Sequence, residues 1–160
     1  MDTITVPTVE DFMRDPTQRR GYLACLAVYH VADYLKPAGS YAPTDIRAKM
    51  EAELGRPFVA LWHMADAVKH REKTGKGGVV LMEAGSDSQR PATGFDMGSP
   101  DNPWRFDDGG GGRWIPGEGC RYDMLDLCVM VLRAYARLYH AELAGSLIDG
   151  IRYNPATYAP

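Results

Sequence analysis

The 160-residue sequence predicts a mainly α-helical bundle with a small β-hairpin inserted before the last long helix. Apolar residues recur at helical spacing in both halves of the chain, which indicates helices with buried faces. Gly, Pro, Ser and Asp dominate residues 74–119, where this period disappears. Hydrophobic residues make up 45% of the chain and charged residues 24%, as in an ordinary globular protein. The length fits one domain spanning residues 1–160.

The first half of the chain predicts four helices. The first covers residues 8–14, because Thr8 and Asp11 have the spacing of a capping box. The second covers residues 16–36, with Asp15 as its cap and Pro16 in its first position. The other two cover residues 44–54 and 57–73, separated where glycine and proline flank Arg56.

The second half predicts a β insertion and one long closing helix. Residues 78–83 form a short strand. Residues 103–106 and 113–115 flank a glycine-rich turn at residues 107–112, which indicates a hairpin across which Trp104 and Trp114 pack. Residues 86–101 are expected to be disordered. The closing helix covers residues 121–144, and the tail at residues 146–160 is irregular.

Charge, hydropathy and cysteine usage narrow the functional class. The net charge of −3 argues against a general nucleic-acid-binding surface but leaves room for a local basic patch. No apolar run is long enough to span a bilayer, and residues 1–9 do not resemble a signal peptide. Cys25, Cys120 and Cys128 show no CxxC spacing and are expected to be reduced thiols. We therefore expect a cytoplasmic protein with no membrane partner.

One phrase occurs twice, as LAVYHVADYL at residues 26–35 and VALWHMADAV at residues 59–68. Each copy places an aspartate three residues after a histidine, about one helical turn away. If the two helices pack together, a divalent metal could bind to side chains of both. The predicted ligands are His30, Asp33, His63, Asp66 and His70. The alternative is that these groups only organise the core, with no metal bound.

Histidine paired with arginine suggests a different chemistry. Arg133 and His140 are seven residues apart, as are Arg56 and His63, so each pair can share one helix face. A histidine transfers protons near neutral pH, while an arginine stabilises a phosphate or a developing anion. Arg56 precedes a proline and is expected to lie outside the helix. The alternative for Arg133 is an ion-pair stripe along its helix.

The helical pair with YHVADYL and WHMADAVKH, the β excursion and the closing helix resemble the HEPN (higher eukaryotes and prokaryotes nucleotide-binding) domains. The resemblance covers about residues 17–143. It implies a four-helix bundle of a bacterial or phage system that binds or cleaves RNA without a metal or cofactor, as a homodimer. The family's motif is an arginine, four to six residues and a histidine, which Arg133 and His140 match in its widest form. The catalytic residues implied are His63, His70, Arg133 and His140.

A third hypothesis is a non-catalytic adaptor that binds a protein partner. The tryptophan-bearing hairpin and the tyrosine-rich tail contain the aromatic residues that interfaces favour. The alternative is that Trp104 and Trp114 only cover one end of the bundle.

Overall fold

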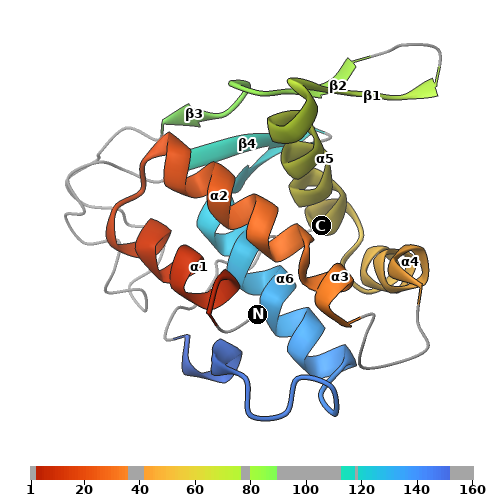
Figure 1. Cartoon of the computed structure of the whole chain (residues 1–160). Coiled ribbons are helices and arrows are strands. Elements are labelled where there is room, and N and C mark those ends of the chain that lie inside the picture. Colours follow the sequence, from red (N-terminus) through yellow and green to blue (C-terminus); the bar gives the residue numbers. More distant parts are fainter. Residues whose placement is uncertain (1–2, 36–41, 77–79, 90–112, 118, 152–160) are drawn as a thin grey trace.

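The computed structural model describes residues 3–35, 42–76, 80–89, 113–117 and 119–151 (Figure 1). It confirms the predicted fold class, a mainly helical bundle with small antiparallel sheets before the last long helix. The helices are α1 (Thr5–Arg14), α2 (Gln18–Tyr29), α3 (Val31–Leu35), α4 (Pro43–Leu54), α5 (Arg56–His70) and α6 (Met124–Leu138), followed by the 3₁₀ helix η3 (Leu147–Gly150). Of the described helices, none has both the length and the apolarity to cross a bilayer.

The start of the chain differs from the prediction in its caps. Helix α1 begins at Thr5, and the Thr8 hydroxyl donates to the Ile4 carbonyl at 2.6 Å, so the predicted capping box is not used. Thr17, not Asp15, caps α2, since its side chain accepts from the Arg20 amide. Asp15 instead accepts from the Arg20 guanidinium at 2.5 Å, and lies extended between the two helices.

The expected helix over residues 16–36 is divided at His30 into α2 and α3. The Asp33 amide donates to the His30 carbonyl at 2.9 Å, a bond over three residues that tightens the backbone there. Farther along, Gly55 adopts a positive φ of 61° and separates α4 from α5 as expected. The predicted helix over 57–73 starts earlier, at Arg56, and ends earlier, at His70.

Two small antiparallel sheets lie beside α5 (Figure 1). Strand β1 (Glu72–Thr74) pairs with β2 (Val80–Glu83), which confirms part of the expected strand. Strand β3 (Ser88–Gln89) pairs with β4 (Arg113–Gly117), which pairs with β5 (Cys120–Asp123). Residues 86–89 belong to the stretch expected to be disordered, yet Asp87 is buried and β3 is paired. Trp104 and the first strand of the predicted hairpin lie outside the described residues.

The closing helix is shorter than expected at both ends. Residues 121–123, predicted as helix, belong to β5, and the Asp123 carboxylate caps α6 by accepting from the Leu125 and Asp126 amides. The helix ends at Leu138, since Tyr139 leaves helical geometry with φ −128° and ψ 41°. Helix α6 packs against α1, α2, α4 and α5. Its largest fully buried side chains are Met124, Leu127, Leu132 and Tyr135.

Candidate functional site

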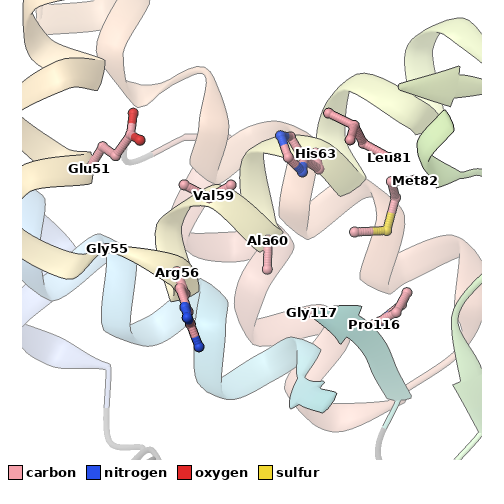
Figure 2. A pocket seen from close by; sticks show the side chains of 10 residues that line it. All are labelled: Glu51, Gly55, Arg56, Val59, Ala60, His63, Leu81, Met82, Pro116 and Gly117. Atoms are coloured by element: carbon pink, nitrogen blue, oxygen red, sulfur yellow. The ribbon is translucent and has the colours of Figure 1, made fainter. Parts of the chain in front are cut away.

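A pocket of about 630 Å³ opens between the start of α5 and the two small sheets (Figure 2). Helices α4 and α5 meet at its rim, and strands β2 and β4 form the opposite wall. The lining residues are Glu51, Gly55, Arg56, Val59, Ala60, His63, Leu81, Met82, Pro116 and Gly117. Its volume lies in the range of small-molecule and cofactor sites.

The polar groups of the pocket come from a short stretch of sequence. Arg56 is the first residue of α5, inside the helix rather than before it, so the expectation for Arg56 was wrong. His63 follows two turns later on the same helix face, about 10.5 Å farther along the axis. Figure 2 shows the Arg56 side chain and the His63 ring at different ends of the pocket, with Glu51 to one side of them on α4.

Positive charge gathers at the start of α5, while Glu51 on α4 places one carboxylate at the same rim. The N-terminus of a helix carries partial positive charge and free amide donors. The first turn of α5 contains no acidic residue, and no side chain caps it. Arg56 adds a full positive charge at the same place. The apolar side chains of Val59, Leu81 and Met82 provide a surface on which an uncharged part of a ligand can pack.

The two repeated phrases do meet, but through their aromatic residues. The Trp62 side chain hydrogen-bonds the Tyr29 hydroxyl. Tyr29 is also approached by the Arg47 guanidinium carbon at 4.5 Å and the Lys69 ammonium at 5.4 Å from the ring centroid. Burial raises the pKa of Tyr29, although the Arg47 charge opposes this. Helices α2, α4 and α5 are therefore joined at one buried tyrosine.

The histidines of the two phrases are placed in different surroundings. The His30 ring nitrogen Nδ1 lies 2.5 Å from Asp33 Oδ2, so the two polar side chains of the first phrase contact each other. Arg47 donates to the other oxygen of Asp33 at 3.2 Å. His63 faces the pocket instead. Among the described residues, no three His, Cys, Asp or Glu side chains are grouped so as to hold a metal ion. The five predicted metal ligands thus do not form one cluster.

The other residues implied by the family resemblance lie outside the pocket lining. His70 is the exposed last residue of α5. Arg133 lies on α6, where its NH2 group donates to the Ile151 carbonyl at 3.4 Å, and it lines a shallow hollow with Ala136, Arg137 and Ile148. His140 is exposed beyond the end of α6. The prediction that Arg133 and His140 share a helix face is wrong, because the helix ends between them.

A polar network around the buried Asp87 carboxylate lies near the same sheets, and the sequence did not predict it. The Asp87 carboxylate accepts from Gln18 at 2.9 Å, from the Tyr22 hydroxyl and from Arg113 Nε at 2.5 Å. Burial alone would raise the pKa of Asp87, but these three hydrogen bonds hold it below its ordinary value. Burial and the bond to Asp87 raise the pKa of Tyr22 to about 12. With every member partnered, the network anchors β3 and β4 to α2.

The missed pocket residues have a weak sequence signal. Glu51 belongs to a polar helix face that looks solvated, and Leu81 and Met82 belong to a strand with no motif. The sequence marked this region only through the break formed by Gly55, Arg56 and Pro57 and through the spacing of Arg56 and His63. Comparisons of the chain with family models, with curated proteins and with solved structures find no match.

Proposed function

We propose that the pocket at the start of α5 binds single-stranded RNA and that His63 transfers a proton in its metal-independent cleavage. The observation that carries the proposal is that Arg56 and His63 line one pocket from one helix. Their spacing is the same as that of Arg133 and His140, the pair that matches the HEPN motif in its widest form. The proposal keeps the function implied by that resemblance and moves its site to α5.

The distance between the two groups favours a polymer over a small phosphate compound. They are separated by about two helical turns, so one phosphate group does not fit both. An RNA strand carries a phosphate on every nucleotide, so one phosphate can lie at Arg56 while the next is at His63. Leu81 and Met82 then provide the apolar surface against which a base packs.

The chemistry needs no metal ion. Cleavage begins when the 2′-hydroxyl loses its proton and its oxygen attacks the adjacent phosphorus. A neutral His63 accepts that proton, and the new bond from the 2′ oxygen to phosphorus closes a 2′,3′-cyclic phosphate. The 5′ oxygen of the next nucleotide leaves as its bond to phosphorus breaks, and it takes a proton from solvent water. Arg56 holds the strand through its charge, and Glu51 on α4 lies at the same rim, where its carboxylate repels a phosphate that approaches from that side.

The test is cleavage and binding of a labelled single-stranded RNA, measured in EDTA. We expect His63→Ala to reduce cleavage by about 10²–10⁴-fold while binding changes little. Arg56→Ala should weaken binding and reduce the dependence of log Kd on log salt by about 1. Arg19→Ala, an exposed arginine on α2 away from the pocket lining, is the matched charge control.

Variants of Arg133 and His140 test whether the reaction takes place at α6 instead of in the pocket. Loss of cleavage in His140→Ala or Arg133→Ala with an unchanged His63→Ala protein would place the reaction on α6 and overturn the assignment to the pocket. If the folded protein binds RNA but does not cleave it, the catalytic role of His63 is wrong and only RNA binding at the pocket remains. Light scattering with and without RNA tests the homodimer that the family resemblance implies.

The second candidate is a non-catalytic protein-binding module. The observation that favours it is the exposure of Val80 and Leu81 on β2, at 43% and 46%, beside the pocket. Exposed apolar side chains that lie together are a feature of surfaces that bind other proteins. This candidate is supported if the wild-type protein binds a protein partner but neither binds nor cleaves RNA. The Leu81→Ser substitution should then abolish binding of that partner.

A further inference from the structure

Two cysteines meet inside the core, from helices far apart in the sequence. The Sγ atoms of Cys25 on α2 and Cys128 on α6 lie 3.9 Å apart across 103 residues of chain. Both side chains are fully buried, whereas Cys120 on β5 is exposed. We propose that Cys25 and Cys128 are a covalent modification site, at which a hydroperoxide converts the two thiols into a disulfide between α2 and α6.

The geometry requires only a small adjustment. A disulfide has a sulfur–sulfur distance of about 2.05 Å, so the two atoms must approach by about 1.9 Å. Closing this gap takes rotation about the Cα–Cβ bonds together with a shift of the helices. Helices α2 and α6 already pack directly against each other. No comparable partner is present for Cys120 among the described cysteines.

The reaction balances with one hydroperoxide. A thiolate sulfur attacks one peroxide oxygen, the O–O bond breaks, and a sulfenic acid and an alcohol or water result. The second thiol then attacks the sulfenic sulfur, the S–S bond forms, the S–O bond breaks, and the hydroxide leaves as water with the thiol proton. Two thiols are oxidised, and one peroxide is reduced by two electrons.

Burial determines the rate and protects the intermediate. The interaction with Cys25 and the apolar surroundings raise the pKa of the Cys128 thiol, so the reactive thiolate is scarce at neutral pH. We therefore expect oxidation over hours rather than seconds, and faster at higher pH. Once one sulfur is oxidised, the neighbouring thiol is already within 4 Å, so the disulfide forms before further oxidation.

The experiment uses the full chain with Cys120→Ser, which removes the exposed thiol and leaves the buried pair intact. The protein is treated with hydrogen peroxide, alkylated while denatured and digested with trypsin. Mass spectrometry should find the peptides containing Cys25 and Cys128 joined and the cross-link sensitive to reductant. The bond should raise the melting temperature by on the order of 10 °C, because it closes a loop of about 100 residues.

Two further proteins make the result decisive. Cys25→Ala in the same background should show neither the cross-link nor the rise in melting temperature, and Cys128→Ala should behave alike. If one of these fails to fold, the Cys120→Ser protein alone still gives the answer. Two alkylated, unlinked cysteines after long exposure, or sulfinic acids at both positions, would overturn the proposal.

Discussion

Arg113 on β4 donates through Nε to the buried carboxylate of Asp87 at 2.5 Å, and its terminal NH2 group binds the same oxygen. The side chain of Asp87 is fully enclosed and that of Arg113 is 14% exposed. Gln18 and Tyr22 on α2 complete the contacts of the carboxylate. Because Pro116 and Gly117 of the same strand line the pocket, this network also holds one wall of the proposed site in place.

Asp87→Ala should lower the free energy of unfolding by roughly 3 kcal/mol, since it leaves a nearly buried guanidinium without its counter-charge. Urea unfolding measures the change. The matched control is Asp11→Ala, whose carboxylate is 58% exposed and pairs with Arg14 on the surface of α1. That substitution should cost less than about 1 kcal/mol. Equal effects of the two substitutions would show that the network contributes nothing beyond a surface ion pair.

The low pKa of Asp87 predicts that the protein loses stability in acid. In the folded state the carboxyl takes up its proton at a lower pH than in the unfolded chain, where its ordinary value is 3.8. Its contribution is therefore fully present above pH of about 4 and is lost as the pH falls through the folded-state value. Urea unfolding between neutral pH and pH of about 3 should show a steeper decline for wild type than for Asp87→Asn. Parallel curves would contradict this role.

Gly21 is placed where a methyl group does not fit. A Cβ atom there would lie 2.4 Å from Met124 Sδ and 3.0 Å from Phe12 Cζ, at the junction of α1, α2 and α6. Both side chains are fully buried, so neither moves aside freely, although the unbranched Met124 side chain has more rotatable bonds than Phe12. Gly21→Ala should therefore destabilise the fold by about 1–3 kcal/mol, despite the better helix propensity of alanine.

Thermal unfolding of Gly21→Ala should be compared with that of Gly150→Ala. A Cβ at Gly150 meets nothing within 4 Å, so the control isolates the effect of crowding. A Gly21→Ala protein as stable as wild type would mean that Met124 moves aside without cost.

The helices were predictable where the hydrophobic period ended at the same position as a glycine or proline that breaks a helix. Gly55 and Pro57 placed the boundary between α4 and α5 correctly, because a positive φ and a missing amide end a helix locally. The division at His30 was not predictable, since no glycine or proline marks it. The start of α6 was misplaced because residues 121–123 pair with β4, a tertiary contact that local propensity does not encode.

The candidate site was predictable only in part. The repeated phrases correctly indicated two helices that pack together, but the contact is made by Tyr29 and Trp62 rather than by histidines. A pocket requires walls from distant segments, and β2 and β4 have no chemical motif. His63 was identified from its spacing, whereas Glu51 needed the packing of α4 beside α5.

Tyr135 provides a final test of the core, through a hydroxyl that has no partner among the described residues. The side chain is fully buried on α6, and its oxygen has no hydrogen-bond partner in the part of the chain that the structure describes. A buried polar group without a partner costs free energy, so removing it should be neutral or favourable. We expect Tyr135→Phe to change the free energy of unfolding by less than about 0.5 kcal/mol or to raise it.

Tyr22→Phe is the matched substitution with the opposite expectation. Its hydroxyl donates to Asp87 and accepts from the Gly85 amide at 2.7 Å, so its removal leaves a buried carboxylate with one donor fewer. We expect a loss of about 1–3 kcal/mol, because a hydrogen bond to a charged group is lost. Urea unfolding of both proteins should separate them clearly. If Tyr135→Phe is as destabilised as Tyr22→Phe, an internal water binds the Tyr135 oxygen. Arg47 Nε is the other buried donor without a partner among the described side chains, and it would be a second group for that water to bind.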